Sequence, residues 1–358
     1  MNEFGVKYRV GIFGSSHGPC VGAKIDGCPA GTKISEAVIQ AELDRRAPGR
    51  GPISSPRKER DRLEIISGIL NGKATGGTIV GLVKNKDFDS SAYDAFLRVP
   101  RPGHADYPAT VKFAGHHDHR GGGIFSGRMT AGLVIAGAVA RQPLEANGVS
   151  LLAQAVQIGS VRLTKDIPFS VAEKMTRRNP VGCADRSTAD LMAEEIVKAH
   201  ELKDSVGGIV KCTVLGLPVG VGEPFFGSIE SNISAMMFSI PGVKGVEFGS
   251  GFRAASMKGS EHNDLYVMKK GKIRTGTNNA GGILGGLSNG MPVEFRVAFK
   301  PTSSIARPQM SVDMVDLKPV ELEVKGRHDP CIVPRAVPVV ENSAATVVLD
   351  LMLQGGFI

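Results

Sequence analysis

Six short runs rich in valine and isoleucine, each bounded by glycine or proline, limit the fold more than any other feature of the sequence. Such runs are typical of β-strands, and they occupy residues 8–14, 63–70, 77–84, 151–161, 208–217 and 292–300. Between them lie five longer stretches with helix start and stop signals, at residues 35–47, 126–148, 187–202, 228–240 and 335–354. Strands and helices follow in mixed order, with few strict strand–helix–strand units. This order favours a layered α+β fold over a doubly wound parallel sheet.

The length of the chain and the lack of internal boundaries indicate one domain, and several of its helices have recognisable end signals. Its 358 residues are enough for one large core or two fused lobes. Because no linker or short-period repeat interrupts the pattern, we expect a single compact domain over residues 1–358. Ser35 and Ser126 stand where a side chain would cap a helix. Pro338 is expected in the first turn of the last helix, where a missing N–H costs little.

The cysteines and the apolar runs indicate the compartment. The five cysteines are odd in number and have no C-x-x-C spacing, which predicts reduced thiols rather than a disulfide framework or a zinc site. No apolar run reaches the roughly 18 residues of a membrane span, and the N-terminus lacks the apolar core and cleavage site of a secretory signal. We expect a cytoplasmic protein with no membrane partner.

The formal net charge of +8 indicates an anionic ligand. Nucleic-acid binders often carry dense basic runs with interleaved aromatic residues. Here the basic residues stand in short glycine- and proline-rich segments such as "DRRAPGRGPISSPRKERDR", "RVPRPGHADY" and "KGRHDP". This distribution favours small phosphorylated ligands over nucleic acid.

Four polar segments combine histidine and arginine with glycine or proline. They are "FGSSHG" (13–18), "RPGHADY" (101–107), "GHHDHRGGGIFSGRMTAG" (115–132) and "KGRHDPCIVPRAVP" (325–338). Each lies between strand and helix signals, so each is expected to be a loop that can meet the others in space. We therefore expect one site built from these four loops.

Two histidines and one aspartate in these loops are candidates for acid–base chemistry. His104 is close in sequence to an arginine and an aspartate, which can tune it for proton transfer near neutral pH; the alternative is a solvent-exposed loop. His17, next to Ser16, is either functional or a turn histidine bonded to the backbone. Asp329 follows Arg327 and His328, and is either a positioned base or part of a salt-bridged turn.

The glycines at 121–123 predict an anion site. They lead directly into the helix expected at Ser126, and a glycine-rich entry to a helix presents free N–H groups and a partial positive charge. Arg120 and Arg128 flank this point. The stretch has neither the G-x-G-x-x-G spacing nor the lysine of a P-loop, so it is no standard nucleotide fingerprint.

A metal is the competing interpretation of the same stretch. His116, His117 and His119 offer nitrogen ligands, but no acidic or cysteine cluster supplies the remaining ligand at a familiar spacing. We expect no metal. Residues 300–308 and the glycine-rich residues 277–292 add serines, a lysine and paired asparagines. Together these features suggest two phosphate-bearing partners, one of them a cofactor, because side chains alone are weak redox agents.

These motifs resemble those of the chorismate synthase family along the whole chain. "FGSSHG" is similar to the family's F-G-E-S-H-G, and further matches follow in family order: "DRRAPG", "RPGHADY", "RGGGIFSGRMTA", "SIPGVKGVEFGSGF", "NNAGGILGG", "KPTSSI" and "GRHDPCIVPRAVPVVE". The resemblance implies a β-α-β sandwich with a large internal core, usually as a homotetramer. It also implies a lyase of the shikimate pathway, which serves aromatic amino acid biosynthesis. That enzyme converts 5-enolpyruvylshikimate 3-phosphate to chorismate and phosphate by an anti-1,4-elimination that requires reduced FMN.

The resemblance also implies roles for individual residues. His17 would protonate the reduced flavin, His104 would protonate the departing phosphate, and Asp329 would help the flavin N5 to accept the C6 proton. Substrate contacts would come from Ser16, Arg46, Arg101 and Arg128. Flavin contacts would come from Ser126, Pro241, Gly242, Gly285, Lys300, Pro301, Thr302, Ser303, Ser304 and Arg327.

Three positions depart from the family pattern. Ser15 replaces a glutamate, Ile124 replaces a polar residue, and Pro52 falls where some members have an arginine that contacts NADP. We therefore expect reduced FMN to come from outside, with NADPH involved only indirectly if at all. The alternative to an enzyme is a non-catalytic paralogue that binds a flavin or a phosphate ligand as a sensor.

Overall fold

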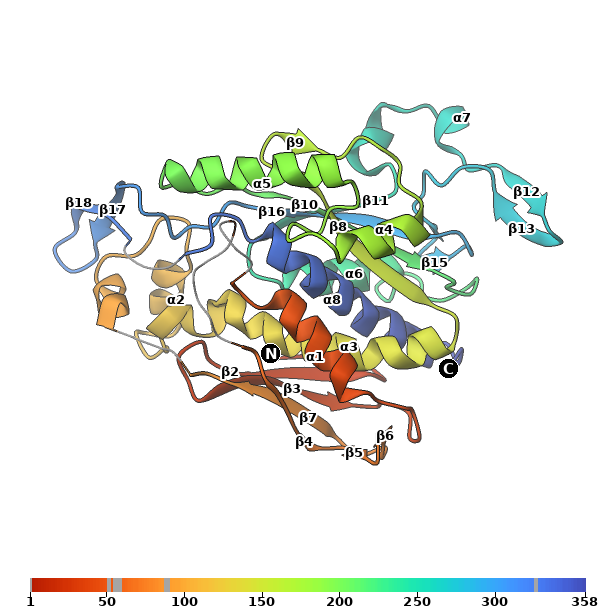
Figure 1. Cartoon of the computed structure of the whole chain (residues 1–358), viewed down its shortest axis with the longest axis horizontal. Coiled ribbons are helices and arrows are strands. Elements are labelled where there is room, and N and C mark those ends of the chain that lie inside the picture. Colours follow the sequence, from red (N-terminus) through yellow and green to blue (C-terminus); the bar gives the residue numbers. More distant parts are fainter. Residues whose placement is uncertain (1, 50–52, 54–59, 87–90, 325–327) are drawn as a thin grey trace.

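Two antiparallel five-stranded sheets enclose a layer of helices (Figure 1). The structure is a computed structural model and describes residues 2–49, 53, 60–86, 91–324 and 328–358. The first sheet has the order β1-β2-β3-β7-β4, and the second has the order β11-β16-β10-β8-β9. Neighbouring strands are antiparallel throughout both sheets. The expected α+β layering is confirmed.

The strands of the two sheets span short segments from both halves of the chain. In the first sheet they are β1 Glu3–Phe4, β2 Arg9–Gly14, β3 Cys20–Asp26, β4 Leu63–Ser67 and β7 Ile79–Lys84. In the second they are β8 Ser150–Ile158, β9 Val161–Arg162, β10 Gly208–Leu215, β11 Val243–Phe248 and β16 Val293–Phe299. Two predicted strands divide at a glycine with positive φ, Gly68 (84°) and Gly159 (52°).

Four helices fill the space between the sheets: α1 Glu36–Arg46, α3 Thr130–Ala146, α6 Ile229–Phe238 and α8 Val333–Gln354. The two longest, α3 and α8, pack against each other, α3 faces the first sheet and α8 the second. They touch at Gly137, where an added Cβ would lie 2.0 Å from the carbonyl oxygen of Asn342. Only glycine allows this approach, so the backbone contact fixes the two helices relative to each other.

Helix α8 is the centre of the core. Its length of 22 residues and mean hydropathy of 1.5 would suit a membrane span, but 94% of its most apolar window is buried inside the protein. It is therefore a core helix. One hydrophobic cluster extends from Tyr8 to Met352 and includes residues of both sheets. That the chain forms a single domain stays a prediction, and the hydrophobic core shared by both sheets supports it.

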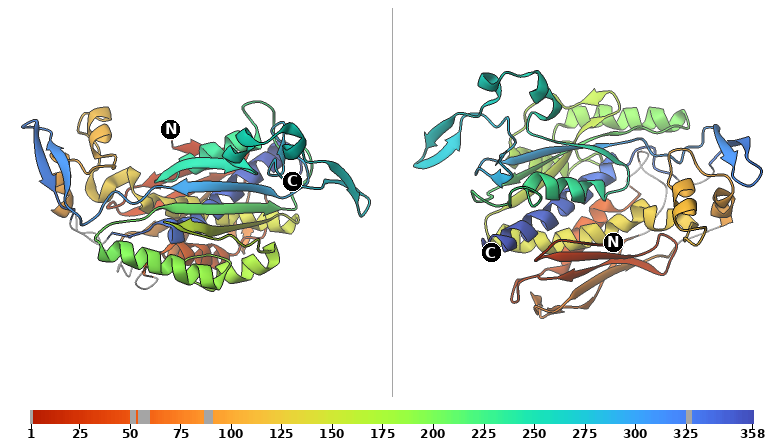
Figure 2. Two further views of the ribbon diagram at one scale, coloured as in Figure 1. Left: turned by 90° about the horizontal axis from the view of Figure 1, so that it is seen from above. Right: turned by 180° about the vertical axis from the view of Figure 1, so that it is seen from behind.

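The remaining elements lie outside these layers. Helices α4 Phe169–Thr176 and α5 Arg186–Glu201 cover the outer face of the second sheet. The hairpins β12–β13 (Tyr266–Lys269, Lys272–Thr275) and β17–β18 (Gln309–Asp313, Lys318–Leu322) project from opposite ends of the molecule (Figures 1 and 2). Short elements complete the chain: β5 Ile69–Leu70, β6 Lys73–Ala74, β14 Ile283–Leu284, β15 Leu287–Ser288, α2 Asp106–Lys112, α7 Gly259–His262, and 3-10 helices at Ser91–Leu97, Arg120–Phe125, Gly127–Met129 and Gly251–Ser256.

Three details of the predicted helix ends were wrong. Ser35 occupies the N-cap position of α1, but its side chain makes no capping bond. Ser126 accepts the Arg128 N–H and so caps a short 3-10 turn, after which α3 begins at Thr130. Helix α8 begins at Val333 with Pro334 in its first turn, so Pro338 lies inside the helix. The five cysteines are free thiols, as expected.

Candidate active site

A pocket of about 600 Å³ lies where α3 and α8 begin and where α1 and α6 end. Its walls come from all four of the loops that the sequence singled out, together with residues 238–244 and 299–304. Helix N-termini carry a partial positive charge, and two of them open on this space. The C-termini of α1 and α6, which carry a partial negative charge, end at the same pocket, so its attraction for anions comes mainly from its arginine and lysine side chains.

Most of the predicted site residues line this pocket. The structure brings together Ser16, Arg46, Arg101, His104, Ser126, Arg128, Pro241, Gly242, Lys300, Pro301, Thr302, Ser303, Ser304 and Asp329. Gly285 does not join them, because its hairpin packs at the opposite end of α6, where Gly286 meets Ser228. Arg327 and Pro52 lie outside the residues that the structure describes.

His104 is held by a carboxylate and a guanidinium. Its Nδ1 lies 2.5 Å from Asp106 Oδ1, and the same carboxylate accepts bonds from Arg101 Nε and Nη2 at 2.8 Å. Burial raises the pKa of Asp106, but hydrogen bonds from Arg101 and His104 outweigh it and hold that pKa well below its ordinary range. Asp106 is therefore an anion that fixes both neighbours, and one imidazole nitrogen of His104 is free of this carboxylate.

His17 lies behind the pocket wall rather than on its surface. It is buried, with 3% of its surface exposed, and its ring meets Tyr93 edge-on at 5.1 Å. Tyr93 and Gly121 line the pocket and separate the imidazole from it. His17 is thus one layer from the position that the resemblance implied for it.

The three adjacent glycines allow the loop to pass close to both histidines. Gly121, Gly122 and Gly123 all have positive φ, at 61°, 82° and 52°. A Cβ on Gly121 would lie 2.3 Å from the His17 ring, and one on Gly123 would lie 2.0 Å from the carbonyl oxygen of Asp118. Any side chain here would displace His17 or the loop. The predicted helix entry is therefore a tight turn of glycines with positive φ, packed on the two histidines.

Two arginines of the pocket share a carboxylate that the sequence analysis missed. Asp61 has no exposed surface, and its two oxygens accept hydrogen bonds from Arg46 and Arg128. Arg46 is itself only 1% exposed and also donates to Thr130 Oγ1 at 3.5 Å. Burial is the main cause that lowers the pKa of Arg46 to about 10. Asp61 stands in a charged stretch that resembles a solvated loop, so only the tertiary structure reveals it.

Asp329 is paired with an arginine of the last helix. Its carboxylate accepts a hydrogen bond from Arg335 in the first turn of α8, and its carbonyl oxygen accepts one from Thr302 Oγ1 at 3.0 Å. Arg335 Nε in turn donates to the Arg46 carbonyl oxygen at 3.0 Å. The side chain of Asp329, which lines the pocket, is 9% exposed. The pocket thus holds a carboxylate fixed by α8.

The segment that follows β16 supplies short polar side chains and one cation. Lys300 Nζ donates to the carbonyl oxygen of Gly103, which ties this segment to the His104 loop. Partial burial and the nearby Lys244 ammonium lower the pKa of Lys300. Ser304 accepts a bond from Arg101 Nη1 at 3.1 Å. Both contacts join loops that are about 200 residues apart in the chain.

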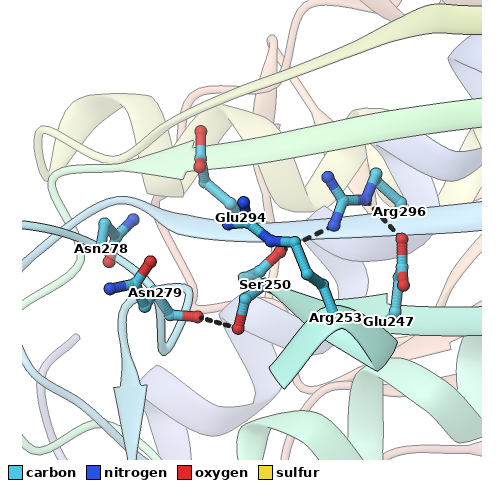
Figure 3. Close-up of a pocket in the computed structure, with 8 residues that line it drawn as sticks. Glu247, Ser250, Arg253, Asn278, Asn279, Glu294 and Arg296 are labelled. Atoms are coloured by element: carbon cyan, nitrogen blue, oxygen red, sulfur yellow. Dashed lines mark hydrogen bonds and ion pairs between the residues drawn. The ribbon is translucent and has the colours of Figure 1, made fainter. Parts of the chain in front are cut away.

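A second cavity of about 330 Å³ lies at the edge of the second sheet, where its charged side chains are visible (Figure 3). Arg296 Nε donates to Glu247 Oε1 at 2.6 Å, and Glu294 pairs with Lys211 at 2.7 Å. Because these charges are already paired and no histidine lines the cavity, it offers less chemistry than the larger pocket. Within the described part of the chain, no three acidic, histidine or cysteine side chains group as a metal site requires.

Loops from both halves of the chain gather arginines and the His104–Asp106 pair around one pocket, and these features define an enzyme for a small anionic substrate. Comparison with known proteins gives the particular family. Its sequence profile, described as chorismate synthase, matches residues 8–353. The chain therefore belongs to the chorismate synthase family, and it is an enzyme of the lyase class.

Individual relatives agree over the full length. The chorismate synthase of Korarchaeum cryptofilum is 50% identical over 98% of this chain and 97% of its own. That of Methanococcoides burtonii is 48% identical over 100% of this chain and 97% of its own. The bacterial enzyme of Dehalococcoides mccartyi is 45% identical over 100% and 98%. A crystal structure of a chorismate synthase superposes with a TM-score of 0.77, at 26% identity, covering 98% of this chain and 93% of the other.

Proposed function

We propose that this pocket converts 5-enolpyruvylshikimate 3-phosphate to chorismate and inorganic phosphate, with reduced FMN as cofactor. The observation that carries the proposal is His104, held by Asp106 and Arg101, in a pocket that Arg128 and the other cationic side chains make attractive to phosphate. The reaction breaks a carbon–oxygen bond and removes a C6 hydrogen. We further propose that the protein works in the cytoplasm as a homotetramer.

We propose that a planar flavin and the substrate share this pocket. Its volume of about 600 Å³ lies within the usual range for cofactor sites. Phe238 and Ile124, which are 55% and 51% exposed, offer apolar contacts for a ring, and residues 300–304 offer an ammonium and hydroxyls for a phosphate. Ser126, Pro241 and Gly242 line the same space and would hold the cofactor with them. When bound, reduced FMN supplies transient electron donation that helps phosphate to leave, without net oxidation.

Arginines bind and orient the substrate. Arg101 and Arg128 line the pocket and are only 4% and 9% exposed, so a ligand would meet them in a partly dry environment. A guanidinium suits paired oxygens of carboxylate or phosphate because its N–H groups form a planar fork. Ser16 and the deeper Arg46 complete the set.

His104 gives a proton to the departing phosphate. Asp106 fixes the ring through Nδ1, which leaves Nε2, 3.3 Å from Arg101 Nη2, for proton transfer. Asp329 is the base that lets the cofactor accept the C6 proton, and Arg335 holds its carboxylate in place. We keep for His17 the proposed role of proton donor to the cofactor, which requires the loop at Gly121 to move aside because the ring is not on the pocket surface.

The direct test is turnover without oxygen. Purified protein, the phosphorylated substrate and chemically reduced FMN are mixed, and chorismate absorbance is followed, with His104→Ala as the matched variant. We expect sustained formation of chorismate by the wild type and a large loss in the variant. If the wild type binds both ligands but forms no chorismate, the protein is the non-catalytic paralogue.

A further inference from the structure

Asp61 is a completely buried carboxylate that the proposed chemistry does not use. Its Oδ2 accepts hydrogen bonds from Arg46 Nε, at 3.1 Å, and Nη2, and its Oδ1 accepts one from Arg128 Nη1. Burial raises the pKa of Asp61, but the charges of Arg46 and Arg128 outweigh it and lower the pKa below its ordinary value. One anion therefore joins two cations of the pocket wall.

The backbone that carries this carboxylate is fixed to α1, the helix of Arg46. Gln40 of α1 donates from Nε2 to the carbonyl oxygen of Asp61 at 2.9 Å, and its Oε1 accepts the Leu63 N–H at 2.9 Å. The backbone on both sides of Arg62 is thus clamped by one side chain. Asp61 has little freedom to move with its partners.

Arg128 is held at two of its three nitrogens. Besides the bond from Nη1 to Asp61, its Nε donates to Asn85 Oδ1 at 3.0 Å. Asn85 is fixed by its own bonds to the carbonyl oxygens of Ser15 and Gly18, at 3.0 and 2.7 Å. Neither bond uses Nη2, and Arg128 lines the pocket, so this nitrogen is the one left to meet a ligand.

We propose that Asp61 is a positioning residue, which aims Arg128 at the phosphate-bearing ligand; this rests on the proposed function. Burial is the main cause that lowers the pKa of Arg46, and the nearby charges of Arg128 and Arg335 lower it further. Without Asp61 these like charges repel one another, and Arg128 loses one of its two anchors. The Asp61 carboxylate therefore holds the Arg128 side chain in one orientation toward the pocket.

A double-mutant cycle tests whether Asp61 acts through Arg128. We expect Asp61→Asn to lower kcat/KM by about thirtyfold or more, and to change it by less than about threefold in an Arg128→Ala background. Asp350→Asn is the matched control: Asp350 is 1% exposed and accepts the N–H groups of Val6, Lys7 and Tyr8, none of which lines the pocket. It should destabilise the protein and leave kcat/KM per folded molecule unchanged. An equal loss from Asp61→Asn in both backgrounds overturns the proposal.

Gln40→Ala is a second variant for the case that Asp61→Asn does not fold. It removes the two hydrogen bonds that hold the backbone around Arg62 but leaves every charge in place. It should lower kcat/KM by about three- to tenfold, and this effect too should vanish in the Arg128→Ala background. An effect that persists there contradicts the proposed path through Arg128.

Calorimetric titration with inorganic phosphate separates this proposal from the function on which it rests. If Asp61 positions Arg128, Asp61→Asn weakens phosphate binding by about tenfold. If Asp61 only lowers the net positive charge of the pocket, the substitution tightens phosphate binding. Unchanged or tighter binding overturns the proposal. A wild type that binds phosphate but turns over no substrate refutes the proposed function, while the titration still decides the role of Asp61.

Discussion

Asp106→Asn is the substitution whose consequences the structure defines best. The carboxylate accepts the backbone N–H of Arg101 at 3.0 Å, two guanidinium bonds at 2.8 Å and the contact with His104 at 2.5 Å. Asparagine keeps the shape but removes the charge, so the Arg101 side chain, only 4% exposed, is left without its counter-ion. Breaking a buried pair in this way costs about 3–5 kcal/mol. We expect a loss of about 3 kcal/mol in the free energy of unfolding at pH 7.

Turnover should fall further than stability explains, because the ring of His104 also loses the group that orients it. We expect kcat per folded molecule to fall about a hundredfold, on the scale of a positioned acid or base. The assay combines denaturant unfolding with turnover under reduced FMN, and Asp350→Asn serves as a buried control with normal turnover. Normal kcat in Asp106→Asn would refute the role given to this carboxylate.

The same carboxylate predicts a pH dependence of stability. Its pKa is lowered in the folded state, despite burial, by bonds from Arg101 and His104. A group of this kind stabilises the fold fully above its unfolded pKa, near 4, and this contribution is lost as the pH falls from there toward the folded pKa. The gap in unfolding free energy between wild type and Asp106→Asn should therefore shrink as the pH falls below about 4. A gap that stays constant down to pH 2 would contradict the assignment.

Further predictions concern the proposed chemistry. His104→Ala should lower turnover by about a hundredfold or more with a much smaller change in substrate affinity, whereas near-normal turnover with a lower melting temperature would mean that the histidine is structural. The Asp329→Asn protein should bind both ligands but turn over about a hundredfold more slowly. Deuterium at C6 of the substrate should slow this variant more than it slows the wild type. Turnover at the wild-type rate would mean that Asp329 serves only as an ion-pair partner of Arg335. Gly121→Ala should displace His17, because the new Cβ would lie 2.3 Å from its ring, and turnover should drop at least tenfold, in contrast to Gly31→Ala, whose added Cβ meets nothing within 4 Å. With Pro52 in place of a family arginine, NADPH and oxidised FMN without a reductase should yield almost no chorismate, and robust turnover there would reveal an intrinsic reductase.

The sequence predicted the layers and the meeting of the four loops, because strand and helix periodicity and loop chemistry are local properties. It missed β3, Cys20–Asp26, since Gly22 and Lys24 interrupt the apolar pattern. The structure explains Gly22: an added Cβ would lie 2.5 Å from the Gly81 carbonyl oxygen on the paired strand β7. That constraint comes from a residue 59 positions away and leaves no local signal.

The charged partners were the least predictable part of the site. Asp61 meets Arg128 across 67 positions, and it stands among arginines that suggest a solvated segment. Arg335 was expected only as part of the last helix, yet it supplies the guanidinium that holds Asp329. His17 was expected in the pocket, whereas the close passage of Gly121 places its ring one layer behind. Burial of a charge depends on tertiary packing, so a single sequence does not reveal it.

The balance of products tests the central claim most directly. Wild-type protein with limiting reduced FMN and excess substrate, without oxygen, should release chorismate and inorganic phosphate in equal amounts, and many molecules of each per flavin. Phosphate released without chorismate would show a phosphatase, and one chorismate per flavin would show a net redox reaction. Either result would contradict an elimination in this pocket.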